Sequence, residues 1–486
     1  MKNLALFAAC LAAASLAAAG RPSEDAMFGG PTAPVAAAAV STSAVAGAPG
    51  RGSDAQELAR VDQGDDFSSG AEVDNPLTLG GLYFQQASVS PLEGYDAGSS
   101  MLQAPLLFDA FMDARPDPRL RGFVQARLTY DPTQPAAGTP TLATAATLKS
   151  EATGVTPTPT ANPELALDQA WLKFDVGRRI FVTAGRQHLK WGVGHYWNPT
   201  DFLSPQKLDP QQLVDERLGT DMLRLAMPLP VANGALTAAA LFDGSDGRLG
   251  GLGGAFRAEM TLGSGELGVD AVTQGGSTPK YGADLSFPLG PLDVYAEAAL
   301  LTGGYSVPTL NGNITAGQAL TAVAGVDSYG GPLLQACAGA SYDFAWRENR
   351  QATLGLEYFY NSLGSQNGDA YPLMIFEGDY QPYYLGRHYV AGYLSAEGPD
   401  EGKHSSYNLS TICNLTDGSL QTRLDLQWVL RNYLTWGAWA AAHYGTPGGE
   451  FNFAVDTPDL AYAGQTVADH VPRTVAALGL SLRLGF

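Results

Sequence analysis

The sequence predicts an all-β fold, a transmembrane antiparallel β-barrel of about 18 strands. Three observations carry this prediction. Polar and apolar residues alternate along many segments of the chain, and the connections between these segments are alternately short and long. The last segment alternates Leu478, Leu480, Leu482 and Leu484 with small or polar residues and ends in Phe486.

The alternating segments have period two, which is the pattern of strands with two different faces. In residues 420–428, leucines and a tryptophan alternate with Gln421, Arg423 and Asp425, and residues 120–130, 256–262 and 292–300 repeat the pattern. Their length of about 9 to 12 residues suits a tilted strand that crosses a bilayer. A secreted β-sandwich or β-helix is the alternative. Its apolar face would need tightly packed large side chains, whereas this one is rich in Ala, Leu and Val opposite full charges.

The connections between the segments carry turn residues. Short ones lie at 116–118, 177–179, 263–265, 290–291 and 347–349, and long polar ones lie at 131–163, 191–217, 302–331, 362–385 and 445–469. This order predicts short periplasmic turns and long extracellular loops. We count about 18 strands between Leu79 and Phe486. The alternative is 16, since the pattern does not define the strand boundaries within 386–414 sharply.

Composition and charge exclude several classes of protein. The chain has 486 residues and a net charge of −20, which argues against nucleic acid as a partner. Outside the N-terminal apolar run of residues 4–19, no apolar run is long enough for a membrane-spanning helix. The mature chain would keep two of its three cysteines, Cys337 and Cys413, as free thiols, and nothing in the sequence predicts a metal site or a cofactor.

The N-terminal residues predict export. Lys2, the apolar run that follows it and Ala17-Ala18-Ala19 read as a signal peptide over residues 1–19. Residues 20–77 are rich in Ala, Gly, Pro and Ser and predict a disordered segment. The barrel then occupies residues 78–486.

If the apolar face of each strand contacts lipid, the charged residues face the lumen. The first strands then carry mainly basic residues and the middle strands mainly acidic ones. This predicts a basic wall opposite an acidic wall; the alternative is that the charges pair locally. The candidate residues of the lumen or its constriction are Arg121, Arg127, Lys173, Arg186, His188, Lys190, Glu259, Asp293, Glu297, Glu357 and Arg423.

One local motif stands out, the stretch Gly185-Arg186-Gln187 followed by Trp191-Gly192 and by residues 198–201. Gly192 lets the backbone turn sharply away from a wall, and residues 198–201 are turn formers. The spacing within 208–218 also suggests a short helix. The candidate ligand-binding residues of this loop are Trp191, Tyr196, Trp197, Asn198 and Asp201; packing against the wall is the other use of their side chains.

This motif and the terminal Phe strand resemble families of Gram-negative outer-membrane barrel proteins, including porin-like and polysaccharide-associated ones. The resemblance implies a cell outer-membrane location and a loop folded inward or over the pore. It also implies recognition of the last strand by the barrel assembly machinery. Outside the motif's roughly 25 residues, only the strand pattern and the last residue match.

Two functions are consistent with these observations. The first is a porin-like channel through which small polar or ionic solutes diffuse. The second is a surface binding or assembly barrel with a plugged pore, whose long aromatic-rich loops hold a polysaccharide or a protein. The six histidines form no compact nucleophile motif, so an enzyme is not expected. The expected partners are outer-membrane lipid and small polar solutes, and a homo-oligomer is more readily expected for 16 strands than for 18.

Overall fold

The computed structural model describes residues 76–94, 100–134, 162–204, 207, 209–229, 233–242, 247–310, 324–347, 350–366, 368–371, 374, 382–399, 404–431, 433–456, 461–462, 465–466, 470–471 and 473–486. The predicted signal peptide and nearly all of the predicted segment 20–77 lie outside these residues. The first strand begins at Leu77, one residue before the predicted start of the barrel.

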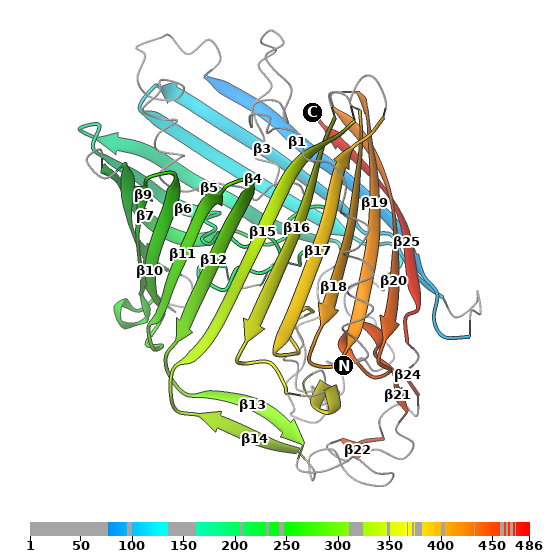
Figure 1. Ribbon diagram of the computed structural model, residues 1–486. Helices are drawn as coiled ribbons and strands as arrows, with labels where there is room; N and C mark the ends of the chain where they lie inside the picture. Colours follow the sequence, from blue (N-terminus) through cyan, green and yellow to red (C-terminus); the bar gives the residue numbers. More distant parts are fainter. Residues whose placement is uncertain are drawn as a thin grey trace.

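The strands form one closed antiparallel barrel (Figure 1). β1 (Leu77–Ser90) pairs with the second strand on one side and with the last strand, β25 (Ala476–Gly485), on the other. Between them, in the order in which they pair, lie β3 (Leu106–Asp117), β4 (Leu120–Tyr130), β5 (Glu164–Val176), β6 (Ile180–Gln187), β7 (Thr220–Leu229), β8 (Gly234–Leu241), β9 (Gly253–Leu262), β10 (Gly265–Thr273), β11 (Lys280–Leu289), β12 (Leu292–Leu301), β15 (Leu333–Arg347), β16 (Arg350–Asn361), β17 (His388–Glu397), β18 (Ser405–Asn414), β19 (Ser419–Arg431) and β20 (Leu434–Gly445).

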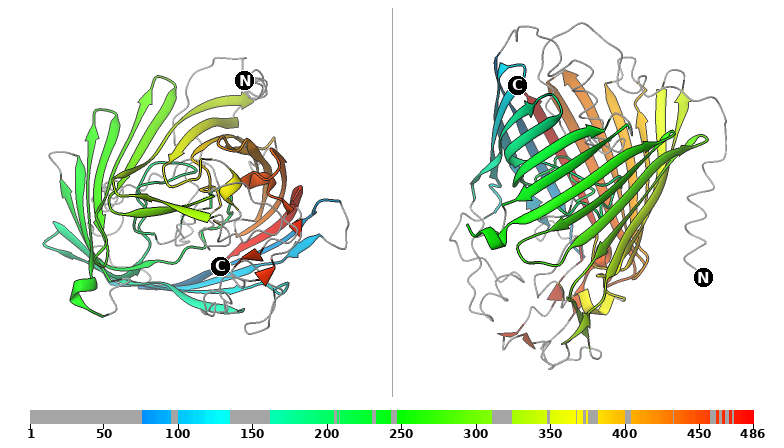
Figure 2. Two further views of the ribbon diagram at one scale, coloured as in Figure 1. Left: turned by 90° about the horizontal axis from the view of Figure 1, so that it is seen from below. Right: turned by 90° about the vertical axis from the view of Figure 1, so that its left-hand side faces the viewer.

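The prediction of 18 strands is confirmed. The sheet contains 19 strands, but β2 (Met101–Gln103) pairs only with β1 and continues the line of β3, so 18 strands close the ring. Figure 2 shows this ring from the end that carries the long connections. Smaller elements lie in the connections: β13 (Tyr305–Leu310), β14 (Ala324–Tyr329), β21 (Val455–Asp456), β22 (Ala461–Tyr462), β23 (Gln465–Thr466), β24 (His470–Val471) and the 3₁₀ turns η4 (Leu249–Gly251), η5 (Gly368–Ala370) and η6 (Glu450–Asn452).

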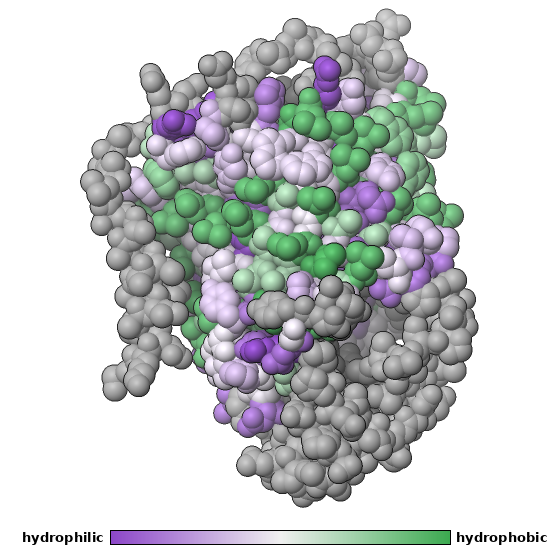
Figure 3. Space-filling view, turned by 90° about the vertical axis from the view of Figure 1, so that its right-hand side faces the viewer, coloured by the Kyte–Doolittle hydropathy of each residue, from purple (hydrophilic) through white to green (hydrophobic). Residues whose placement is uncertain are grey.

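The side chains of each strand alternate between an apolar outer face and a largely polar inner face. On β25, Leu478 and Leu480 are more than half exposed, whereas Ser481, the residue after Leu480, is buried. Figure 3 shows the hydrophobic side chains gathered over the strands of one side of the barrel. No helix among the described residues has the length and apolar character needed to cross a membrane.

The short and long connections lie at opposite ends of the barrel, as predicted. Phe486 and the tight turns share one end in Figure 1, and the hairpin of β13 and β14 lies at the other. The outer connection between β18 and β19 is short, because only Leu415–Gly418 separate the two strands. Cys337 on β15 and Cys413 on β18 are buried free thiols on strands that are not neighbours.

The predicted helix over 208–218 is wrong for the part of it that the structure describes, residues 209–218. Side chains and distant strands use the backbone groups that a helix would need. Asp209 and Asp215 accept the backbone N–H groups two residues ahead of them, from Gln211 and Arg217. Such local side-chain bonds compete with helical ones.

Candidate functional site

The connection between β6 and β7, residues 188–219, folds into the barrel, and we call it the inner segment. Its described residues bond to inward-facing side chains on both sides of the ring. Two buried glutamates of the wall, Glu297 on β12 and Glu357 on β16, hold its first half. Two arginines, Arg127 on β4 and Arg423 on β19, hold its second half. The inner segment therefore crosses the lumen.

Glu297 binds backbone groups of the inner segment. Its carboxylate accepts N–H bonds from Val193 at 2.8 Å, Gly194 at 3.1 Å and Thr200 at 2.7 Å, and a hydroxyl bond from Thr200 at 2.8 Å. Gly192 passes so close that a Cβ atom there would lie 2.6 Å from the carboxylate oxygens, at a φ of +96° that favours glycine. The Trp-Gly pair of the motif thus lets the backbone reach this carboxylate.

Glu357 binds the next turn of the inner segment. Its carboxylate accepts the N–H groups of His195 at 2.7 Å and Trp197 at 2.9 Å, and the hydroxyl of Tyr295 on β12 at 2.6 Å. Hydrogen bonds to an ionised acceptor are stronger than neutral ones, and a buried backbone N–H must have a partner. The two glutamates supply acceptors that this irregular backbone lacks.

Aromatic rings pack the same turn against the wall. Trp197 stacks on Phe359 with 5.2 Å between centroids and donates its ring N–H to the carbonyl of Tyr383. His195 stacks on Tyr393 at 4.3 Å. Burial, together with the charge of Lys190, lowers the pKa of His195 to about 4, so its ring is neutral at pH 7.

The second half of the inner segment is held through its carbonyl groups. Arg127 donates to the carbonyls of Asp215 and Arg217 at 3.3 and 3.4 Å, and Arg423 donates to the carbonyl of Gln211 at 2.9 Å. Arg217 itself forms ion pairs with Asp201 and Asp215, both at 2.8 Å. Together with the bonds to Glu297 of β12, which lies nearly opposite β4 in the ring, these bonds tie the segment to opposite sides of the barrel.

The five loop residues predicted to bind a ligand are all buried. Their exposed fractions are 4% or less, and the rings among them pack against the wall or lie beneath its side chains, as Trp191 does beneath Arg257. Asp201 accepts a hydrogen bond from Arg217 at 2.8 Å. The structure therefore shows the rings of Trp191, Tyr196 and Trp197 packed within the barrel and Asp201 in an ion pair, and ligand binding by these residues and Asn198 stays a prediction.

The basic and acidic walls expected from the sequence are not segregated, because acids lie beside the basic residues. Arg127 pairs with Asp109 at 2.9 Å and Asp168 at 3.3 Å. The local pairing considered as the alternative is what the structure shows at these positions. The other ion pairs of the inner wall are Arg121 with Asp113, Arg257 with Glu259, Asp270 and Asp284, and Arg423 with Asp425.

The prediction that Arg186 faces the lumen is wrong. Its cross-strand partner is Asp221, to which it pairs at 2.6 Å, and directly opposed residues share a face of the sheet. Asp221 lies on the same face of β7 as the exposed Leu223 and Leu225, which follow it at two-residue intervals. Arg186 therefore lies on the outer face at the loop end of β6, and its neighbour Gln187 faces inward.

The structure places the remaining lumen candidates as follows. His188 lies at the start of the inner segment and contacts Asp168 at 2.7 Å, and Lys190 is exposed two residues later. Lys173 is buried on the inner face of β5, opposite Arg121. Asp293 shares the inner face of β12 with Tyr295 and Glu297.

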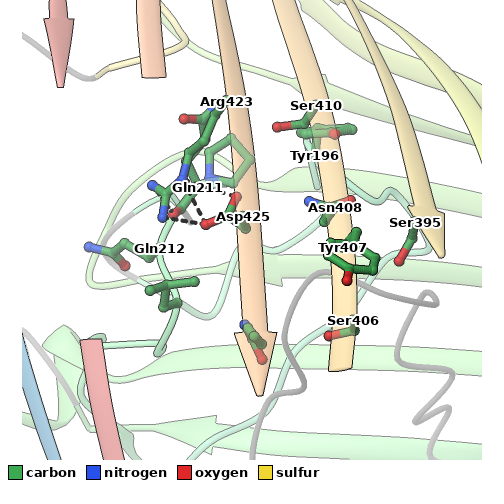
Figure 4. Close-up of a pocket in the computed structure, with 13 residues that line it drawn as sticks. Tyr196, Gln211, Gln212, Ser395, Ser406, Tyr407, Asn408, Ser410, Arg423 and Asp425 are labelled. Atoms are coloured by element: carbon green, nitrogen blue, oxygen red, sulfur yellow. Dashed lines mark hydrogen bonds and ion pairs between the residues drawn. The ribbon is translucent and has the colours of Figure 1, made fainter. Parts of the chain in front are cut away.

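A polar pocket lies between the inner segment and the strands β17, β18 and β19 (Figure 4). The lining residues Ser395 and Ser406 lie toward the short-turn ends of β17 and β18. Figure 4 shows Ser406, Asn408 and Ser410 along one strand, beside Arg423 and Asp425 of the next. The full lining is Tyr196, Pro210, Gln211, Gln212, Leu213, Ser395, Ser406, Tyr407, Asn408, Ser410, Arg423, Asp425 and Gln427.

The sequence predictions missed several residues of this site. Tyr295 could have been found, because it lies between Asp293 and Glu297 at two-residue spacing and so shares the polar face of its segment. Asn408 and Ser410 are harder to predict. They alternate with Leu409, but the sequence does not define the strand boundaries of this segment sharply. Gln211 has no periodic signal, because it lies in an irregular connection.

Comparison with known proteins gives structural likeness only. No protein-family model matches the chain, and no curated protein matches it. Among solved structures, OccAB1 of Acinetobacter baumannii has a TM-score of 0.47 and 11% identity, over 87% of this chain and 99% of that one. A mutant of the Rh. blastica porin has a TM-score of 0.40 and 10% identity, over 84% of this chain and 100% of that one.

Proposed function

We propose that this barrel is an outer-membrane channel through which small polar solutes diffuse past the inner segment. The observation that carries the proposal is the contrast between the two faces of the closed sheet. Leucines cover the outside, and arginines, carboxylates and amides line the inside together with some aromatic rings. A lining of charged residues suits a water-filled lumen, and hydrocarbon suits the outer face.

The inner segment acts as the constriction in this proposal. It crosses the lumen and is bonded to β4, β12, β16 and β19. Solutes would pass between this segment and the parts of the wall that it leaves uncovered. Export by residues 1–19, insertion guided by the last strand and association of identical barrels belong to the same proposal.

A barrel with a plugged pore that binds a polysaccharide or a protein is the second candidate. One observation favours it, namely the number of bonds that fix the inner segment across the lumen. The two candidates differ in conductance. Purified protein refolded into planar bilayers should give discrete current steps if it is a channel. Silent insertion, together with retention of cell-surface glycan, would instead support the plugged barrel.

The variant Glu357→Gln tests the role of the inner segment. The change removes a charged acceptor of several buried donors, which costs roughly 2–5 kcal/mol of local stability. We expect the segment to detach part of the time, with a rise in single-channel conductance of about twofold or more. Glu164→Gln, at the loop end of β5, is the matched control and should conduct like the wild type. Equal conductance of all three proteins would show that the segment does not limit the current.

A further inference from the structure

We propose that the polar pocket beside the inner segment binds the hydroxyl-bearing edge of an uncharged, sugar-like solute. This inference rests on the proposed channel function, since it gives the solute class for which the constriction carries a binding site. Three features of the pocket support it: buried amide groups without partners, compensated charges, and a position at one mouth of the constriction.

The first feature is a set of carboxamide atoms that lack hydrogen-bond partners. The oxygen of Asn408 and both amide atoms of Gln211 are buried and have no partner among the described residues. Asn408 is itself 91% buried, with an exposed fraction of 9%. A carboxamide both donates and accepts, and so does an alcohol. A hydroxyl of a bound solute would satisfy these groups, whose unpaired burial costs free energy.

The second feature is the absence of a net charge from the described lining. Arg423 and Asp425 are its only charged members, and they pair with each other at 2.7 Å. The remaining outer nitrogen of Arg423 donates to the carbonyl of Gln211, and its guanidinium lies 4.3 Å from the ring centroid of Trp439. An anionic or cationic solute would find no unpaired counter-charge here, so the lining favours a neutral solute.

The third feature is the density of hydroxyl and amide groups at one end of the constriction. Ser395, Ser406 and Gln427 add further donors and acceptors near the turn ends of β17, β18 and β19. Several convergent polar groups fix the orientation of a polyhydroxylated molecule better than one group does. Because these groups lie toward the short-turn ends of the strands, we expect a solute to reach them from that side.

Direct binding of D-glucose to the full-length protein in detergent tests the proposal. Equilibrium dialysis with radiolabelled glucose should show saturable binding with a dissociation constant below about 100 mM. Asn408→Leu and Gln211→Leu should each weaken it about tenfold or more, because each removes a buried partner of a hydroxyl. Gln86→Leu, the same change on the inner face of β1, should leave it within about twofold. Gluconate and glucosamine should bind about tenfold more weakly than glucose.

Further variants and measurements keep the proposal testable if a leucine variant fails to fold. Ser395→Ala and Ser406→Ala leave the wall intact and should each weaken glucose binding about threefold. In bilayers, glucose on the short-turn side should reduce the current more than glucose on the loop side. Absence of saturable binding, equal binding of the charged analogues or unchanged affinity of all four variants would overturn the proposal. Binding by a protein that conducts no current would overturn the channel and leave the pocket assignment standing.

Discussion

Glu297 and Glu357 are wall glutamates that accept backbone N–H bonds from the inner segment, a role that the residue type alone does not predict. Both are carboxylates on the inner face of a barrel, and the alternation of their segments predicted that position. Their partners are backbone N–H groups 97 to 162 positions away in the sequence. Nothing in the local sequence identifies a partner at that distance, so the residues could be predicted and their role could not.

The charge of Arg127 allows a test of lumen electrostatics. Arg127→Gln removes the cation that pairs with Asp109 and Asp168 and leaves both carboxylates facing the lumen. We expect the channel to become more cation-selective, by a reversal-potential shift of several millivolts in a KCl gradient. Arg186→Gln is the control, because that side chain lies on the outer face. A shift in the control equal to that of Arg127→Gln would contradict the placement of Arg186.

At the scale of the elements, the sequence predicted the strands and the lengths of several connections, but it did not predict the path of the inner segment. Alternation fixes which residues face lipid, since a register slip of one residue would reverse every face. The ends of β4 and β5 therefore lie within one residue of the predicted limits of their connection. The inner segment has no such period. Its shape depends on the wall around it, which explains why the helix predicted within it was wrong.

Glu450 joins its own outer connection to the connection before β17 and to the loop ends of β17 and β18, and it makes this packing dependent on pH. In η6, it accepts bonds from the backbone of Tyr383, from the hydroxyl of Tyr389 and from the amide of Asn414. Burial, with the charge of Asp417, raises the pKa of Glu450 to about 7. The folded form thus favours the protonated acid, and this stabilisation is complete below pH of about 4.5 and is lost as the pH rises through 7.

Limited proteolysis of the folded barrel measures this effect. We expect the outer connections to be cleaved roughly fivefold faster at pH 8 than at pH 5, because an opening free energy lower by about 1 kcal/mol gives that ratio. After correction for the protease's own pH profile, Glu450→Gln should remove the difference. Asp369→Asn, an exposed position in the connection between β16 and β17, should keep it. A difference that persists in Glu450→Gln would assign the effect to another group.

The seam between β1 and β25 offers a test of barrel closure. Phe486 exchanges backbone bonds with Gly81, at 2.8 and 3.1 Å, and its ring stacks on Phe108 with 5.9 Å between centroids. Phe486→Ala keeps the backbone bonds and loses the ring, which should lower the stability by about 1 kcal/mol. The temperature at which the folded band disappears in gel electrophoresis measures this loss. Tyr433→Ala, another exposed aromatic at the same end, should change it less; an equal change would mean that the seam is not involved.

At the scale of the whole molecule, the apolar exterior requires a solvent other than water. Leucines, valines and methionines with exposed fractions of about two fifths recur on the outer face of most strands. A soluble protein rarely exposes a continuous apolar band of this extent. The closed ring also leaves no unpaired strand edge, which is the condition that hydrocarbon imposes on a spanning sheet.

The depth dependence of a lysine substitution tests whether a bilayer covers this surface. Leu356 lies in the middle of β16, and Leu289 lies at the turn end of β11. In phospholipid vesicles, Leu356→Lys should destabilise the folded barrel by about 2–4 kcal/mol, and Leu289→Lys by about 0–1 kcal/mol. Reversible unfolding in guanidinium chloride measures both. Equal and small costs would indicate that the middle of the outer face is not in hydrocarbon.

The long sequence separation of the bonds that hold the inner segment has a consequence for the order of folding. Bringing together residues this far apart in the sequence costs chain entropy, and that cost must be met before the bonds that offset it can form. Since β12 and β16 follow the segment in the chain, its final shape requires that both have already joined the growing sheet. An assembly intermediate arrested before β16 would therefore be an open sheet whose inner segment lacks its bonds to Glu357 and Arg423 but can already form those to Arg127 and Glu297. The last of these bonds, from Arg423 of β19, therefore forms only when most of the wall is already in place.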